Sequence, residues 1–174
     1  RLMDNTMGGS GYDIACAGSN HPIFYSRQPG TEPQIEQANF DPLFIKKMGI
    51  VYLNKKQSSA QQVKTFLESG HYYQRLIRQV SKIAEEMTKT EEINLFMKLM
   101  NQHEKLIAEA TGLTPVQEQL FPTFGGAIKS LGAWGGDFAL FVSDKDYQSN
   151  KNWFKRKGYP LVMPLDEVMV KTKN

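Results

Sequence analysis

The order of strand-like and helix-like segments after residue 43 constrains the fold of this chain more than any other feature. The segment LFIKKMGIVYLN (43–54) predicts a strand, with a bulge at Gly49 because a glycine inside a strand is typical of one. Further along, GGAIKSLGAWGGDFALFVSD (125–144) predicts two strands, 127–131 and 138–142, joined by a glycine-rich loop. A helix up to about Lys157 and a last strand around 161–163 complete the order.

Between the first two of these strands, the apolar residues recur with helical spacing. Ser59 and Gln62 form a capping box that predicts a short helix ending at Gly70. Two longer helices follow, the second beginning near Thr88 and Glu91 and stopping at Gly112. We expect their apolar stripes to belong to the core; they consist of Tyr73, Leu76, Ile77, Val80, Ile83, Ala84 and Met87, and then of Ile93, Phe96, Met97, Met100 and Ile107.

With the additional helices set aside, the order is strand, helix, strand, strand, helix, strand. This is the ferredoxin-like arrangement of the α+β class, an antiparallel sheet with helices on one face. Upstream of it, PIFYSR (22–27) predicts a short strand, and the proline- and glycine-containing segment after it predicts a surface loop or hairpin.

Composition excludes several classes of protein. A chain of 174 residues is one domain or one domain plus a piece, and a net charge of +3 is too small to indicate a nucleic-acid or membrane surface. The single cysteine, Cys16, fits a reducing compartment, and the sequence lacks a long apolar run or a signal-peptide core, so we expect a cytoplasmic protein. The start at Arg1, a few residues before a glycine-rich turn, suggests a fragment.

The common nucleotide and metal motifs are missing from the sequence. None of the Lys-Ser or Lys-Thr pairs follows the glycine that a Walker A loop requires, and the glycine loop at 132–137 joins two strands instead of opening a helix as a Rossmann loop does. One cysteine and three scattered histidines make a structural zinc site very improbable, and no metal ligands are assigned.

Two glycine-rich stretches remain as candidate sites. The first, GGSGYDIACAGS (8–19), contains Asp13, and the second, GAWGGD (132–137), ends in Asp137. Glycine allows positive φ and close backbone approach, so such a stretch can present backbone amides to a ligand. The alternative for the first stretch is a loop in which Asp13 caps a helix.

Both stretches resemble motifs of the GHMP kinases, the superfamily of galactokinase, homoserine kinase, mevalonate kinase and phosphomevalonate kinase. GSGYDIACAGSNHPIFYSR resembles the family's Ser-Gly-x-Asp segment, and AIKSLGAWGGDF resembles its C-terminal glycine motif. LNKKQSSAQQV and MNQHEKLIAEATGLTP are similar to the family's strand-to-helix junction and to the helix before the glycine motif. The phosphomevalonate-kinase-like branch is the most similar one, and the resemblance covers nearly the whole chain.

The resemblance implies roles for individual residues. Asp13 matches the acid that acts as general base or orients the acceptor hydroxyl, and it is the expected catalytic residue. The residues expected to bind substrate or phosphate are Ser10, Gly11, Lys56, Ser58, Ser59, Gly132, Ala133, Trp134, Gly135, Gly136 and Asp137. The sequence departs from the family at Trp134, where glycine is usual, and at Leu131, where a hydroxyl residue is usual.

The family's glycine-rich phosphate loop has no counterpart in the sequence. By this resemblance, residues 1–28 are the tail of a truncated N-terminal GHMP kinase domain, and residues 29–174 are the C-terminal domain. ATP and Mg²⁺ are the implied cofactors, with their main ligands expected in the missing N-terminal part, so this fragment is expected to be inactive alone.

The leading interpretation is therefore the C-terminal part of an ATP-dependent kinase that phosphorylates a hydroxyl or phosphate of a mevalonate-type metabolite. The expected partner is a small-molecule substrate, with neither nucleic acid nor membrane. One alternative is a diphosphomevalonate-decarboxylase-like enzyme. The other is a noncatalytic ferredoxin-like module that binds nucleic acid or a protein partner, because KNWFKRK (151–157) mixes aromatic and basic residues. A solvated helix face explains that run more simply, since the sheet lacks the Lys/Arg-Gly-aromatic pattern of RNA-binding strands.

Overall fold

The computed structural model describes residues 10–28, 31–55, 74–132 and 136–169. Contacts divide the chain into two units, residues 1–41 with 169–174 and residues 42–168. The boundary between the N-terminal and C-terminal kinase domains, placed at residues 28 and 29 from the sequence, stays a prediction. Within the described residues, no helix has the length and apolar character needed to cross a bilayer.

The first unit contains one short helix and one hairpin. Helix α1 (Tyr12–Ala17) is followed by strands β1 (Ile23–Ser26) and β2 (Gln34–Gln37), which pair antiparallel. The hairpin confirms one of the two structures expected after residue 27. Tyr12 packs edge-on against Tyr25 with ring centroids 5.7 Å apart, which ties the helix to β1.

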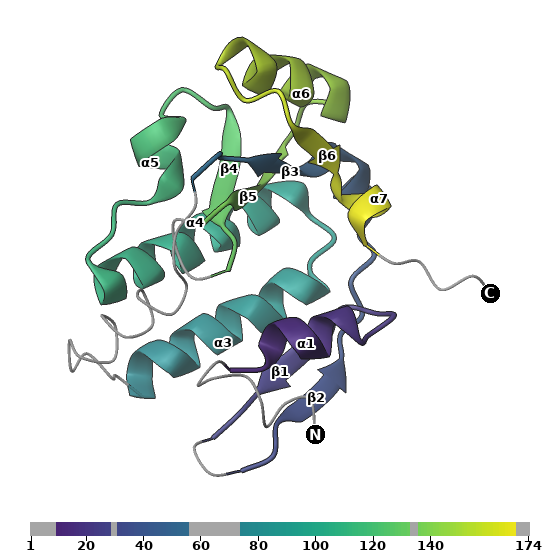
Figure 1. Ribbon diagram of the computed structural model, residues 1–174, viewed down its shortest axis with the longest axis vertical. Helices are drawn as coiled ribbons and strands as arrows, with labels where there is room; N and C mark the ends of the chain where they lie inside the picture. Colours follow the sequence, from purple (N-terminus) through teal and green to yellow (C-terminus); the bar gives the residue numbers. More distant parts are fainter. Residues whose placement is uncertain (1–9, 29–30, 56–73, 133–135, 170–174) are drawn as a thin grey trace. The chain divides into compact units, whose positions relative to one another are not determined.

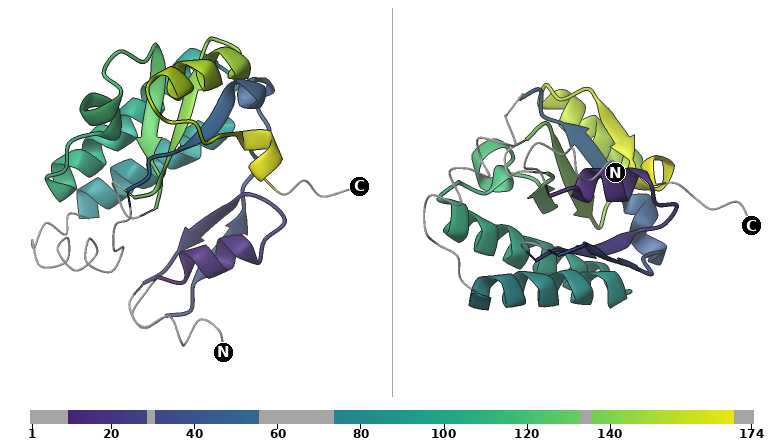
Figure 2. Two further views of the ribbon diagram at one scale, coloured as in Figure 1. Left: turned by 45° about the horizontal axis from the view of Figure 1, so that its top comes forward. Right: turned by 60° about the horizontal axis from the view of Figure 1, so that its bottom comes forward.

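The second unit contains a four-stranded sheet (Figures 1 and 2). Its strands are β3 (Met48–Tyr52), β4 (Gly126–Ser130), β5 (Phe138–Ser143) and β6 (Val162–Pro164), in the order β4-β5-β3-β6, and every neighbouring pair is antiparallel. The other elements are the 3-10 helix η2 (Leu43–Lys47) and the helices α3 (Gln74–Lys89), α4 (Ile93–Thr111), α5 (Val116–Leu120), α6 (Tyr147–Arg156) and α7 (Leu165–Val168).

The core of the second unit lies against the sheet face that carries Val51, Ala139 and Phe141. The Phe141 ring lies 4.8 Å from that of Phe154 on α6, and Phe121 packs edge-on against Phe154 at 5.2 Å. The register places Met48, Ala127 and Val142 together on the opposite face, and their side chains are also fully buried. Both faces are therefore covered, in contrast to the single covered face expected from the sequence.

The segment before β3 differs from its prediction. Residues 43–47 form η2 instead of the first half of a strand, and Leu43 is almost fully exposed. Gly49 makes no bulge, because it pairs in register with Phe141 on one side and Pro164 on the other. A β-carbon at Gly49 would lie 2.7 Å from the Met163 carbonyl oxygen and also against the Phe141 ring, so close packing explains this glycine.

The two long helices confirm the predicted periodicity, but only one is buried. Helix α4 ends at Gly112, whose φ of 70° is left-handed, and it buries Phe96 and Met100. None of the residues of α3 is buried, so the stripe from Leu76 to Met87 is a half-buried surface beside α4 and not core. Tyr73 and the predicted helix 59–70 lie outside the described residues.

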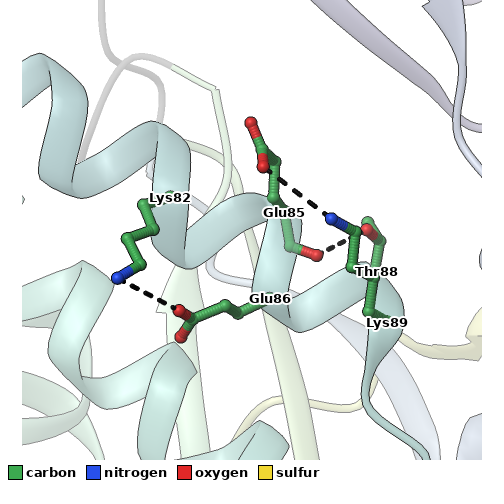
Figure 3. A network of polar contacts seen from close by, with 5 residues as sticks. All are labelled: Lys82, Glu85, Glu86, Thr88 and Lys89. Carbon is green, nitrogen blue, oxygen red and sulfur yellow. Dashed lines mark hydrogen bonds and ion pairs between the residues drawn. The ribbon is translucent and has the colours of Figure 1, made fainter.

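The outer face of α3 carries ion pairs one helical turn apart (Figure 3). Lys82 Nζ lies 3.8 Å from a Glu86 carboxylate oxygen, and Lys89 Nζ lies 3.9 Å from Glu85. Thr88 Oγ1 donates to the Glu85 carbonyl at 2.9 Å. Such exposed pairs stabilise a helix only slightly, so they mark the solvated side of α3.

Candidate functional site

The first predicted site lies at the start of α1. Gly11 precedes the helix with a φ of 78°, which confirms that the turn needs a residue free to adopt a left-handed backbone. Asp13 stands exposed in the first helical turn, where the helix dipole favours a carboxylate. The helix has no side-chain cap, so the alternative in which Asp13 is the cap is wrong.

Ser10 connects this turn to β1. Its hydroxyl oxygen accepts a hydrogen bond from the Tyr12 amide at 3.3 Å. Its carbonyl oxygen accepts hydrogen bonds from the Tyr25 hydroxyl and, at 3.2 Å, from Arg27 Nη1. Ser10, Gly11 and Asp13 therefore belong to one small, hydrogen-bonded turn, in which the Asp13 side chain is exposed.

The second predicted site begins where β4 ends. Gly132 has a φ of 70°, and a β-carbon at Gly136 would lie 3.4 Å from the Leu131 carbonyl oxygen. The base of the loop is closed by a hydrogen bond of 3.1 Å from the Leu131 amide to the Phe138 carbonyl. Asp137 anchors it to the residue after β3, because its main-chain carbonyl oxygen accepts from the Leu53 amide at 2.7 Å.

Part of the predicted site lies outside the described residues, namely Lys56, Ser58, Ser59, Ala133, Trp134 and Gly135. The rest falls into two groups, with Ser10, Gly11 and Asp13 in the first unit and Gly132, Gly136 and Asp137 in the second. One carboxylate oxygen of Asp137 is buried and, within the described part of the chain, has no hydrogen-bond partner. Burying an unpaired carboxylate oxygen costs free energy, and a hydrogen bond from a bound ligand would offset that cost at Asp137.

A pocket of about 120 Å³ lies beside the end of β4, and its residues were not predicted as a site. Lys55 and Leu53 line it after β3, Glu104 and Ile107 line it from α4, and Ser130 lines it from β4. The connection from the end of α4 to the start of α5 closes it, with Thr111, Leu113, Thr114, Pro115 and Val116. The pocket thus combines apolar walls with a buried carboxylate, as small-molecule sites often do.

Glu104 is the central polar residue of this pocket. Its side chain is only 5% exposed. One carboxylate oxygen accepts from the Ser130 amide at 3.2 Å and from the Val116 amide at 3.5 Å, and the other accepts from the Ser130 hydroxyl at 3.1 Å. The sequence carried a signal for this residue, because Glu104 falls on the apolar stripe of α4 between Met100 and Ile107.

Two basic side chains near Glu104 are half-buried. Burial lowers the pKa of Lys129, while the charge of Glu104 acts in the opposite direction, and Lys129 Nζ donates to the Ser130 carbonyl at 3.1 Å. Burial, followed by the charge of Lys129, lowers the pKa of His103 to about 4. His103 Nδ1 is buried without a hydrogen-bond partner among residues the structure describes. Its pKa of about 4 leaves the imidazole neutral at pH 7.

These residues do not make a metal centre. Among residues 10–28, 31–55, 74–132 and 136–169, three or more His, Cys, Asp or Glu side chains nowhere gather into a possible metal site. Mg²⁺ in nucleotide sites is usually held by one or two carboxylates together with the phosphates, so the binding of ATP and Mg²⁺ stays a prediction.

The sequence matches no protein-family model and no curated protein. Among solved structures, it is similar to L. major mevalonate kinase in complex with R-mevalonate, with 18% identity and a TM-score of 0.59 over 80% of this chain and 47% of that one. It is also similar to the Lin0012 protein from Listeria innocua, with 17% identity and a TM-score of 0.56 over 79% of this chain and 43% of that one.

The chain therefore spans less than half the length of these two proteins. At such identities the similarity concerns the fold alone. It shows that this mixed helical and antiparallel-sheet chain has a fold similar to part of that mevalonate kinase.

Proposed function

We propose that this chain is the acceptor-binding part of an ATP-dependent small-molecule kinase of the GHMP type, built on a ferredoxin-like C-terminal domain. The observation that carries the proposal is the similarity to a mevalonate kinase over 80% of the chain, which accompanies glycine turns in both predicted motifs. The sheet order β4-β5-β3-β6 supports the ferredoxin-like part, because it puts the first strand between the third and the fourth.

In this proposal the chain's own residues handle the acceptor. Asp13 accepts the proton of the acceptor hydroxyl, a task that suits an exposed carboxylate in the first turn of a helix. The glycine loop after β4 gives backbone access to the phosphate side of the substrate. The acceptor is a hydroxyl or phosphate of a mevalonate-type metabolite, and ATP and Mg²⁺ are bound by residues other than those described.

The test requires a longer protein that contains this chain and a nucleotide-binding part. The coding sequence upstream of Arg1 is read first, and we expect it to encode a glycine-rich phosphate loop. An upstream sequence without such a loop, or without any further coding region, would contradict the proposal.

In that longer protein we expect Asp13→Asn to lower kcat by roughly 10²- to 10⁴-fold, because the amide keeps the shape but cannot take a proton. KM for the acceptor should stay within about threefold, since binding contacts are retained. The control is Glu36→Gln, which removes another exposed carboxylate of the first unit and should leave kcat unchanged. Equal kcat for Asp13→Asn and wild type would remove Asp13 from the reaction.

A further inference from the structure

On one side of strand β4, the backbone amides and carbonyls form hydrogen bonds with side chains instead of with another strand. β5 pairs with β4 on one side, and β4 is the last strand of the sheet on the other. On that open side, Gln117 Nε2 donates to the Gly126 carbonyl at 3.0 Å and Gln117 Oε1 accepts from the Ile128 amide at 2.9 Å. Glu104 continues the row by accepting from the Ser130 amide at 3.2 Å.

Glu104 does more than Gln117 at this edge. Its two carboxylate oxygens also accept hydrogen bonds from the Ser130 hydroxyl and the Val116 amide. One buried carboxylate therefore links α4, the first residue of α5 and the last residue of β4. Hydrogen bonds to a charged acceptor are stronger than neutral ones, and losing the acceptor would leave buried donors without partners.

The position of Ser130 gives this link its importance. It is the last residue of β4, and the chain reaches the left-handed Gly132 only two residues later. At the other end of the loop, Phe138 begins β5, and its carbonyl oxygen accepts a hydrogen bond from the Leu131 amide. The direction in which the chain leaves the sheet at Leu131 therefore depends on how firmly Ser130 is held.

We propose that Glu104 is a positioning residue, whose buried carboxylate fixes the end of β4 and so sets the path of the chain into Gly132. Its role in catalysis rests on the proposed function, whereas its role in holding the strand end does not. The carboxylate acts through Ser130 and has no contact with the reacting atoms in this proposal.

The first experiment measures amide hydrogen exchange in the 174-residue chain without any ligand. Glu104→Leu keeps the volume but removes both acceptors, and we expect exchange at Leu131 to accelerate by about tenfold or more beyond any change at Val51 in the centre of the sheet. Glu104→Gln retains an oxygen for the amide donors, and its nitrogen can donate to Ser130 Oγ, so it should restore most of the protection.

Gln117→Leu is the matched control, because it removes two backbone hydrogen-bond partners from the same strand edge, farther from the loop. It should lower the melting temperature as Glu104→Leu does. The amide exchange rates at Leu131 and Val51 should, however, change by the same factor. If Glu104→Leu also changes Leu131 and Val51 equally, the carboxylate only stabilises the fold and the proposal is wrong.

The catalytic consequence is measured in the longer protein. Glu104→Leu should lower kcat by about tenfold or more, Glu104→Gln should restore it, and Gln117→Leu should leave it within about threefold. Equal kcat losses in the two leucine variants would refute the catalytic role. A wild-type protein without phosphotransfer would contradict the proposed function, and the exchange result would still decide whether Glu104 holds the strand end.

Discussion

At the scale of single residues, burial controls the charge of His103. Its pKa falls from 6.5 to about 4, mainly through burial and then through the nearby Lys129. Glu104 is the other charged group in this cluster, and it acts on Lys129. Because the folded pKa lies below the unfolded one, the unfolded chain binds more protons between pH 4 and 6.5.

We therefore expect the free energy of unfolding to decrease as the pH is lowered from 6.5 toward 4, by at most about 3 kcal/mol from this residue. His103→Gln removes the proton-binding group, so the variant should lack this loss of stability. The free energy of unfolding of wild type relative to the variant should therefore decrease as the pH is lowered over this range. Urea unfolding at several pH values measures it. The control His21→Gln alters an exposed histidine, and it should leave the pH dependence as in wild type. A difference between wild type and His103→Gln that is constant with pH would contradict the assignment.

Residue-scale prediction from the sequence succeeded where local backbone geometry decides. Gly11 and Gly112 adopt the left-handed conformations that their patterns indicated. It failed at Gly49, because the reason for that glycine is the Phe141 ring and the Met163 carbonyl, which belong to strands far away in sequence. Glu104 was missed for the same reason, since its partners lie 12 and 26 residues further along the chain.

At the scale of elements, the start of helix α6 is secured by the side chain of its N-cap residue. Asp146 precedes the helix, and its carboxylate accepts from the Ser149 amide at 2.8 Å and from the Ser149 hydroxyl at 2.7 Å. These hydrogen bonds lower the pKa of Asp146, and the bond from the Ser149 hydroxyl has the largest effect. The cap therefore contributes stability at neutral pH and loses it as the pH falls through the lowered pKa.

We expect Asp146→Ala to lower the melting temperature at pH 7 by several degrees, because the first turn of α6 loses its acceptor. Asp144→Ala is the control, since it removes an equal charge from the same loop, and the hydrogen bond of Asp144 with Lys47 Nζ at 2.9 Å uses its main-chain oxygen. Calorimetry at pH 7 and at pH 3 measures both variants. The difference between them should shrink at the lower pH, and equal melting temperatures at pH 7 would show that the cap is unimportant.

The elements that the sequence predicted well are those with a local signal. The strands β4, β5 and β6 and the helices α4 and α6 lie within one or two residues of the expected ranges, apart from the start of α4. The stretch 43–47 was misread because its apolar residues suit a strand, but it has no neighbouring strand to pair with in the sheet. The stripe of α3 was expected in the core, yet periodicity alone does not say how completely a partner covers a helix.

At the scale of the whole molecule, we expect the nucleotide to be bound outside the described residues. The phosphate loop is missing from the sequence, and the part of the chain that the structure describes holds no metal-ligand cluster. We therefore expect the 174-residue chain to bind Mg-ATP no more tightly than about 1 mM, a level that scattered contacts can provide. Titration calorimetry measures this, with Mg-GTP as the comparison. A micromolar dissociation constant would place a nucleotide site within this chain.

The side chains that occupy the open edge of β4 also affect how this protein meets other chains. An unpaired strand edge is a template onto which a strand of another molecule can add, and such addition is a common route to aggregation. Gln117 and Glu104 already use the backbone groups of residues 126, 128 and 130 that an incoming strand would need. The opposite edge, β6, is only three residues long and ends at Pro164, which has no amide hydrogen to offer. One edge of the four-stranded sheet is thus partly occupied by side chains and the other is short, which hinders the addition of a strand from another molecule.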